Sequence, residues 1–329
     1  MFVKKNVIAP ILISLVIFLL SCTIVGCNKS NENNDSNGIN DGLEITFIDP
    51  ALESSIRSVL DKPKGTIYSK DLEVLTDLQL SKRNITSLQG LQYCTNLISL
   101  GLSGNQVTDI SAVASLKNLR ELRLDWNNIT DITPIQALPH LVRLTLDGNK
   151  IADLSPLSSM PFLTELSLNN CDIVDITDLT GLTTLNTLSL TANTIADIKP
   201  LGSLVNLTTL SLASNKIINI SPLTTLHNLK QLGLNNNGLV DISSLARLPG
   251  ITMLNLSANS LTDISVLADL DNLVWIWLQN NNINDVTPII LNGNLNKGHF
   301  ADLRNNPLSE ESTDIILTEL RGRGLLVYW

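Results

Sequence analysis

A pattern of leucine, isoleucine and asparagine recurs every 22 residues along most of this 329-residue chain. One copy runs through Leu119, Leu122, Leu124, Asn127 and Ile129, and later copies keep the same spacing. A fixed period in this range predicts a solenoid of stacked repeats. One repeat cannot bury its own apolar side, so the repeats must share one continuous core. No other feature of the sequence restricts the fold so strongly.

One column of the repeat is asparagine in eight copies and cysteine in one. An inward-pointing amide at the end of a strand can pair with backbone N–H and C=O groups that the turn leaves without partners. We therefore interpret this column as structural. In chain order it holds Asn105, Asn127, Asn149, Cys171, Asn193, Asn215, Asn237, Asn259 and Asn281.

The LxxLxL part of each repeat alternates apolar and polar residues, which is typical of a short strand with one buried face. Stacked strands would form a parallel sheet with about 4.8 Å between neighbours. Proline-containing returns such as Pro134-Ile135 and Pro156-Leu157 indicate tight turns or 3₁₀ segments on the opposite side. The predicted fold is an α/β solenoid with a curved parallel sheet on its concave face and 3₁₀ or turn segments on its convex face.

These columns resemble the 22-residue leucine-rich repeats of bacterial internalin-like proteins, over residues 75–291. Upstream, Asp49-Pro50 supplies an N-cap acceptor and a proline at the first helical position, so a short helical cap is expected over residues 43–74. Residues 292–329 contain a degenerate last repeat and a C-terminal cap, because the terminal repeats must shield the core from water. Residues 1–26 and 27–42 precede this unit as a leader and a tether.

The leader begins with Lys4 and Lys5 and continues with an apolar run over residues 7–25, as in secretory signals. Its end, IVGC, resembles the bacterial lipoprotein signal, and that resemblance implies that Cys27 becomes the first mature residue and carries lipid. The alternative is an uncleaved transmembrane anchor, since the run is nearly long enough to span a bilayer. Residues 28–42 are mostly Asn, Ser, Asp and Gly, too polar to fold. We expect an extracytoplasmic, membrane-anchored lipoprotein of a bacterial cell envelope.

Composition and motifs exclude several classes of function. The formal net charge of −9 argues against nucleic-acid binding, which relies on lysine and arginine. No P-loop, GxSxG, HExxH or CxxC motif occurs, so we expect no enzyme, no cofactor and no metal site. A column of aspartates, Asp109 to Asp285, is interpreted as turn caps, and a row of calcium sites is the rival interpretation.

Candidate binding residues lie at the outward positions of the predicted strands. Tryptophans two residues apart on a strand point to the same face, and exposed tryptophan is enriched in binding hot spots. The alternative is that residues 292–300 cover this pair. The candidates are Trp275 and Trp277, Met253 and Asn255 on the preceding coil, and Glu121, Arg123, Arg143 and Trp126 on early coils.

The expected function is protein–protein binding or adhesion through the concave face by a monomer. A carbohydrate-binding module is the second hypothesis, because aromatic faces also stack on sugar rings. An envelope protein with a structural role and no discrete ligand is the third. The internalin resemblance raises adhesion only by analogy, since a repeat is not a site.

Overall fold

The computed structural model describes residues 42–329, all within one compact unit. The predicted leader, Cys27 and residues 27–41 of the predicted tether lie outside the described residues. The unit begins with β1 (Glu44–Ile45), which pairs antiparallel with β2 (Ile67–Tyr68). Helices α1 (Pro50–Val59) and α2 (Ser69–Leu72) complete this N-terminal segment. No helix between residues 42 and 329 has the length and apolar character needed to cross a membrane.

Twelve parallel strands then form one sheet in which every strand pairs with its neighbours in the sequence. From β3 to β12 the paired residues are 22 positions apart, as in Glu121 opposite Arg143. The strands are β3 (Asp77–Gln79), β4 (Ser99–Gly101), β5 (Glu121–Arg123), β6 (Arg143–Thr145), β7 (Glu165–Ser167), β8 (Thr187–Ser189), β9 (Thr209–Ser211), β10 (Gln231–Gly233), β11 (Met253–Asn255), β12 (Trp275–Trp277), β13 (Phe300–Asp302) and β14 (Leu326–Tyr328).

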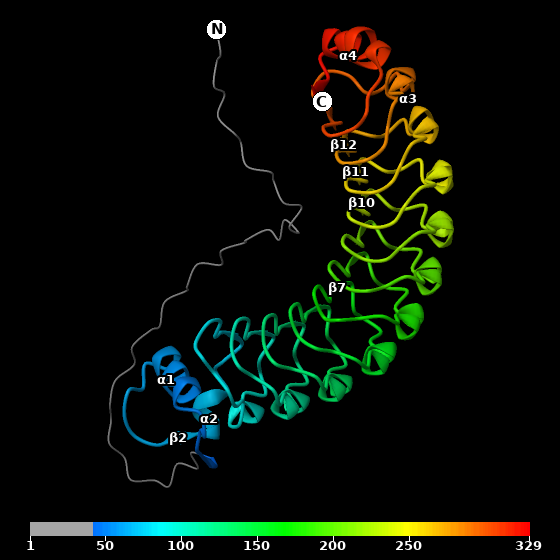
Figure 1. Cartoon of the computed structure of the whole chain (residues 1–329). Helices are drawn as coiled ribbons and strands as arrows, with labels where there is room; N and C mark the ends of the chain where they lie inside the picture. Colours follow the sequence, from blue (N-terminus) through cyan, green and yellow to red (C-terminus); the bar gives the residue numbers. More distant parts are fainter. Residues whose placement is uncertain (1–41) are drawn as a thin grey trace, which may run out of the picture. The chain divides into compact units, whose positions relative to one another are not determined.

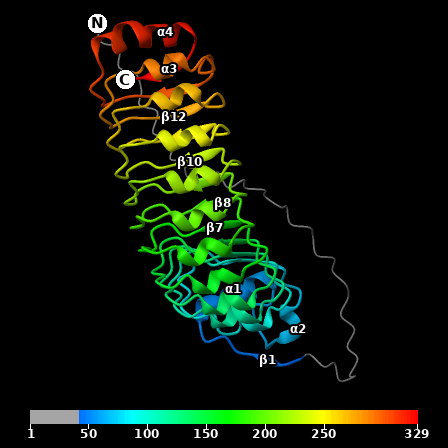
Figure 2. The same cartoon turned by 90° about the vertical axis from the view of Figure 1, so that its right-hand side faces the viewer.

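The return segments of the coils are short 3₁₀ helices. Figure 1 shows them along the outer side of the curved stack, with the strands on the inner side, and Figure 2 shows the coils one above another. The predicted leucine-rich solenoid, with its concave parallel sheet and convex 3₁₀ segments, is therefore confirmed. These segments are η1 (Leu91–Tyr93), η2 (Ser111–Ser115), η3 (Thr133–Ala137), η4 (Ser155–Ser159), η5 (Thr177–Gly181), η6 (Lys199–Ser203), η7 (Ser221–Thr225), η8 (Ser243–Arg247) and η9 (Ser265–Asp269), followed by helix α3 (Thr287–Leu291).

The core is a continuous column of leucine and isoleucine side chains between the sheet and the return segments. Leu122, Leu144 and Leu188, at the centres of their strands, have no exposed surface. Each coil contributes the same set of apolar positions, so the core has the same cross-section along its length. Because each repeat contacts only its neighbours, stability in such a stack is close to a sum of local terms.

Both ends of the core are covered by atypical segments. At the N-terminus, Leu52 and Ile56 of α1 are fully buried, and Asp49 caps the helix by accepting hydrogen bonds from the backbone of Ala51 and Leu52 at 2.8 and 2.9 Å. At the C-terminus, a π-helical turn, η10 (Ser312–Ile316), continues into α4 (Leu317–Gly322), which packs beside β14. Leu317 and Leu320 of α4 are fully buried.

Candidate functional site

The concave face of the sheet is made of the outward residues of each strand, which lie on either side of a buried apolar residue. Because the strands pair in register, residues in the same column stack directly on one another. Three zones of different chemistry follow one another along this face. They are a charged zone on β5–β7, a polar zone on β8–β10 and an aromatic zone on β12–β14.

In the charged zone, the arginines are already paired. Arg123 donates to Glu121 through Nε at 2.7 Å, and Arg143 donates to Glu165 through Nη2 at 2.7 Å. The hydrogen bond to Glu165 is the main reason that the pKa of Arg143 is raised. Glu121 also lies 3.4 Å from Arg143, so the four side chains form one cross-strand network. A partner would have to compete with these internal ion pairs.

The second residue after β5 and after β6 is an aspartate, and the two carboxylates belong to a second polar ladder. Asp125 Oδ2 accepts hydrogen bonds from Ser103 and Thr145, and Asp147 Oδ1 accepts from Ser167 at 2.7 Å. Burial, together with the nearby Asp125 carboxylate, raises the pKa of Asp147. In the polar zone the outward residues are small, among them Thr187, Ser189, Thr209 and Ser211.

In the aromatic zone, four rings from three adjacent strands form one contact network, here called the aromatic cluster: Trp275, Trp277, Phe300 and Tyr328. The centroids of the two tryptophan rings lie 5.8 Å apart, and Phe300 lies 6.0 Å from Trp275 and 5.5 Å from Trp277. Tyr328 extends the network at 5.8 Å from Phe300. Tilted rings at these separations have a favourable pair geometry.

The aromatic cluster is partly covered by its own members and partly open to solvent. Trp275 and Tyr328 keep 38% and 44% of their surface exposed, whereas Trp277 and Phe300 are half-buried. The alternative prediction is that residues 292–300 cover Trp275 and Trp277. Phe300 packs against both tryptophans, but Trp275 stays partly exposed. Because the rings contact one another, burial of this surface would cost less side-chain entropy than burial of isolated, freely rotating side chains.

Phe300 and Tyr328 are members of this surface that were not predicted from the sequence. The strand pairing of Trp275 with Phe300 spans 25 residues and that of Phe300 with Leu326 spans 26, so the 22-residue column is lost there. The available signal was the alternation in Phe300-Ala301-Asp302 and Leu326-Val327-Tyr328, each with a buried central residue.

The remaining candidate residues occupy different places. Met253 and Asn255 lie half-buried on β11, next to the tryptophans in the sheet. Trp126 lies outside the sheet, in the turn after β5, with a positive φ of 54° and 61% of its surface exposed. Its ring covers Gly148 so closely that no Cβ atom would fit there. The structure therefore does not bring Trp126 together with the aromatic cluster.

Each asparagine of the repeat column links neighbouring coils through its side chain. Asn149 donates from Nδ2 to the carbonyls of Leu146 and Leu124 at 2.8 and 3.0 Å, and its Oδ1 accepts from the backbone of Ile129 at 3.0 Å. Asn306 in the degenerate last repeat makes the equivalent bonds to Leu303, Leu278 and Ile283. The same pattern of amide bonds is found at Asn105, Asn127, Asn193, Asn215, Asn237, Asn259 and Asn281.

The aspartate column forms turn caps. Asp131 and its equivalents each accept a hydrogen bond from the backbone N–H two residues later, and Asn219 does the same with its amide oxygen. Hydrogen bonds from Thr133 lower the pKa of Asp131. These contacts agree with the structural interpretation of the column, and among residues 42–329 no group of three or more His, Cys, Asp or Glu side chains forms a potential metal site. The column comprises Asp109, Asp131, Asp153, Asp175, Asp197, Asn219, Asp241, Asp263 and Asp285.

Neither described cysteine has the properties of a reactive thiol. Cys94 and Cys171 are buried in different coils, and each is free. Burial raises the pKa of the Cys94 thiol to about 12 and that of Cys171 to about 11. Since the thiolate is the nucleophile, both side chains have packing roles.

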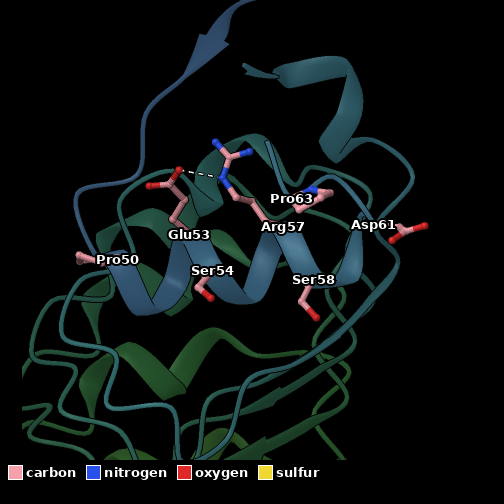
Figure 3. Close-up of a pocket in the computed structure, with 7 residues that line it drawn as sticks. All are labelled: Pro50, Glu53, Ser54, Arg57, Ser58, Asp61 and Pro63. Atoms are coloured by element: carbon pink, nitrogen blue, oxygen red, sulfur yellow. Dashed lines mark hydrogen bonds and ion pairs between the residues drawn. The ribbon is translucent and has the colours of Figure 1, made fainter. Parts of the chain in front are cut away.

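A shallow pocket lies on the outward side of α1 (Figure 3). Arg57 turns toward Glu53 in this view, and its Nε lies 2.9 Å from the carboxylate. Because this ion pair spans one helical turn and neutralises both groups, the pocket offers no free charge from that pair. The other lining residues are Pro50, Ser54, Ser58, Asp61 and Pro63.

Comparisons with known proteins agree with this architecture. The family described as Leucine Rich repeats (2 copies) matches residues 117–159 and 205–247. Among solved structures, an internalin (inlF) from Listeria monocytogenes is 30% identical over 86% of this chain and 91% of that one, with a TM-score of 0.73. An internalin C2 (inlC2) from the same species is 31% identical over 71% and 94%, with a TM-score of 0.55. The functional domain of its InlJ, which includes a cysteine ladder, is 23% identical over 85% and 59%, with a TM-score of 0.68. No curated protein matches the chain significantly.

Proposed function

This chain belongs to the internalin-like family of leucine-rich repeat proteins, and from that premise we propose that it binds a protein partner through its concave face. The aromatic cluster is the observation that carries the proposal. It supplies an apolar anchor with fixed geometry on a surface that is otherwise polar, which is the usual composition of a protein-binding hot spot. None of the comparisons indicates a catalytic family, so the activity proposed is binding or adhesion.

The aromatic cluster is a better anchor than the charged zone. Arg123 and Arg143 already pair with Glu121 and Glu165, so a partner gains little by replacing those contacts. Trp275 and Tyr328 have open surface that can be buried without breaking an internal hydrogen bond. At their margin Leu326 is 53% exposed and enlarges the apolar area. Met253 and Asn255 border the cluster on β11 and would contact the same partner.

We also propose that the solenoid is anchored outside a bacterial membrane through lipid on Cys27. The support is the sequence of residues 4–27, with its charged start, apolar run and IVGC ending. A polar tether would hold the concave face away from the bilayer and leave it open to proteins of the same envelope, another cell or a host. Mass spectrometry of the membrane-extracted protein separates this anchor from an uncleaved transmembrane segment, because processing at Cys27 removes residues 1–26 and adds lipid, whereas an uncleaved segment keeps the full-length mass.

The binding proposal is tested by immobilising the full-length chain and offering cell-envelope and culture extracts. The Trp275→Ala/Trp277→Ala variant is run beside it, with Thr209→Ala/Ser211→Ala in the polar zone as a matched control on the same face. We expect a protein that is captured by the parent and by the control but not by the tryptophan variant. Equal capture by all three would contradict a role for the aromatic cluster.

Soluble glycans added as competitors distinguish the carbohydrate hypothesis. If soluble glycans displace the captured material from the parent, and the tryptophan variant does not bind these glycans, the aromatic cluster binds sugar. If neither proteins nor glycans depend on the tryptophans, the structural role in the envelope becomes the better account.

A further inference from the structure

A second surface lies on the flank of the solenoid, beside the N-terminal ends of β4, β5 and β6 and distant from the aromatic cluster. It is an open pocket of about 440 Å³, here called the flank pocket. Asn96, Ile98, Asn118, Arg120 and His140 line it, and all five residues are exposed. They come from three successive coils, so only stacking brings them together.

The two asparagine side chains of the flank pocket have a fixed orientation. Asn96 donates from Nδ2 to the carbonyl of Glu73 at 2.8 Å, and Asn118 donates to the carbonyl of Thr95 at 3.0 Å. The amide nitrogens are held against the backbone, and neither Oδ1 accepts a hydrogen bond from residues 42–329. The pocket therefore presents two positioned acceptors, which favour a ligand with several O–H or N–H donors.

Arg120 brings an unbalanced positive charge to the flank pocket. Within residues 42–329 its guanidinium group makes no hydrogen bond and no ion pair. This differs from Arg123 and Arg143 on the concave face, and the chain as a whole has a formal net charge of −9. An arginine that is free of partners is a suitable donor for a carboxylate, to which it can make two parallel hydrogen bonds.

The third feature is an aromatic and apolar wall. His140 and Phe162 occupy successive places of the column that holds Asn96 and Asn118, and their rings lie 6.3 Å apart. Because His140 and Phe162 replace asparagine, these two coils lack the side-chain hydrogen bond to the preceding coil. The Phe162 side chain is 56% exposed, and Ile98, in the coil of Asn96, is 45% exposed. The exchange of a structural amide for exposed rings is not explained by packing, but it provides a face on which a flat or ring-shaped ligand can stack.

The equivalent place five coils further along the chain, beside β9, β10 and β11, serves as an internal control. There Asn206 and Asn228 make the same backbone bonds, at 2.8 and 3.0 Å, and Lys230 stands where Arg120 does. Thr208 replaces Ile98 and Gly250 replaces His140, so the apolar floor and the ring are missing. The flank pocket thus differs from the general repeat in the residues that would contact a ligand.

We propose that the flank pocket binds a carboxylated sugar, such as a sialic or uronic acid unit of a glycan. Such a unit carries, within one ring, a carboxylate for Arg120, hydroxyl donors for Asn96 and Asn118, and an apolar face for His140. An acidic peptide segment offers a carboxylate and N–H donors, but an aspartate or glutamate side chain has no ring face to stack on His140, so the observations favour the sugar. This site is separate from the proposed protein-binding face, and neither depends on the other.

The test is titration calorimetry of the full-length chain with 3′-sialyllactose and a hyaluronan tetrasaccharide, with lactose and N-acetylchitotetraose as their uncharged counterparts. The variants are Arg120→Ala and His140→Asn, the second of which restores the common residue of the column. Lys230→Ala is the matched control at the equivalent place. We expect an acidic sugar to bind, its neutral counterpart to bind more weakly, and Arg120→Ala to weaken binding by roughly tenfold. His140→Asn should also weaken it, whereas Lys230→Ala should not.

Three results would overturn the proposal. The first is that neither acidic sugar binds the parent across the millimolar range. The second is an equal loss on Lys230→Ala, which would indicate general charge attraction. The third is that a tetraglutamate peptide binds as tightly as the sugars and with the same dependence on Arg120, which would make the ligand an acidic peptide.

Discussion

At the scale of single residues, Cys171 is the one position of the asparagine column, from Asn105 to Asn281, that is not asparagine. Its Sγ lies 3.3 Å from the carbonyl of Leu146, so it keeps one of the two donor contacts. It has no acceptor corresponding to the amide oxygen, and within residues 42–329 the backbone N–H of Ile151 has no hydrogen-bond partner. A buried donor without a partner destabilises a fold.

Replacing Cys171 with asparagine should therefore stabilise the protein. The new Oδ1 would accept from Ile151, as Asn149 does from Ile129, and we expect the free energy of unfolding to rise by about 1 kcal/mol. Thermal and urea-induced unfolding measure the change. The reciprocal variant Asn149→Cys should lower stability by a similar amount. A loss of stability in Cys171→Asn would show that the coil has adapted to the smaller thiol.

At the scale of secondary-structure elements, Asp49 joins helix α1 to the first coil. Its Oδ1 caps the helix, and its Oδ2 accepts from the backbone and hydroxyl of Thr86 at 2.7 and 2.8 Å and from the backbone of Ser87 at 3.2 Å. Burial by itself raises the pKa of this carboxyl group, but hydrogen bonds from Thr86, Leu52 and Ser87 outweigh it and hold the pKa at about 2. A lowered pKa means that folding favours the ionised form.

This contact should make the N-terminal cap sensitive to acid. The stability contributed by Asp49 is fully present above the ordinary pKa of aspartate near 4 and is lost as the pH falls toward 2. Its size is at most about 2.5 kcal/mol. We expect Asp49→Asn to lower the free energy of unfolding by up to this amount at pH 7. One carboxylate oxygen becomes an NH2 group, which is itself a donor and cannot accept hydrogen bonds from Ala51 and Leu52 on one side or from Thr86 on the other.

Urea unfolding from pH 7 down to pH 3 measures this effect. The difference between parent and Asp49→Asn should shrink below about pH 4. Asp61→Asn is the control, because Asp61 is exposed and lies in a turn with a positive φ of 50° that asparagine tolerates. A difference that stays constant with pH would disprove the linkage.

At the scale of the whole molecule, the solenoid is a row of similar units closed by two different caps. Contacts run between adjacent coils, so damage at one end should stay near that end. The C-terminal cap is critical because it lies beside the aromatic cluster. Leu317, Leu320 and Val327 cover the last coil, and β14 contributes Tyr328 to the aromatic cluster.

A charged residue in this cap should loosen the last coils and leave the rest folded. For Leu320→Asp we expect amide hydrogen exchange in β12, β13 and α3 to accelerate by at least roughly a hundredfold, with β5–β7 unchanged. Hydrogen–deuterium exchange with mass spectrometry maps the effect. Thr318→Asp, on the exposed side of the same helix, should exchange like the parent. Uniform acceleration along the chain would mean that the solenoid unfolds as one cooperative unit.

Much of the fold could be read from the sequence, because the information is local and repeated. Each 22-residue unit contains its own strand pattern, its asparagine and its return segment, and stacking forces all units into one register. The concave sheet and convex 3₁₀ segments follow from that pattern. Arg123, Arg143 and the tryptophan pair also followed, since alternation along a strand determines which side chains face outward.

Tertiary structure decided what the period could not show. Near the C-terminus the paired strand residues are 25 and 26 positions apart instead of 22, so the repeat pattern does not predict that Phe300 and Tyr328 lie near Trp275. Strand pairing in the folded structure brings them together. Trp126 lies three residues after β5, in a turn with a positive φ, and its ring packs over Gly148 of the next coil. The sequence by itself therefore determined the repeating scaffold, because that pattern is satisfied within each coil and its neighbours. The two surfaces proposed to bind ligands were decided only by the stack, because their members come from different coils and acquire their neighbours, charge balance and exposure there.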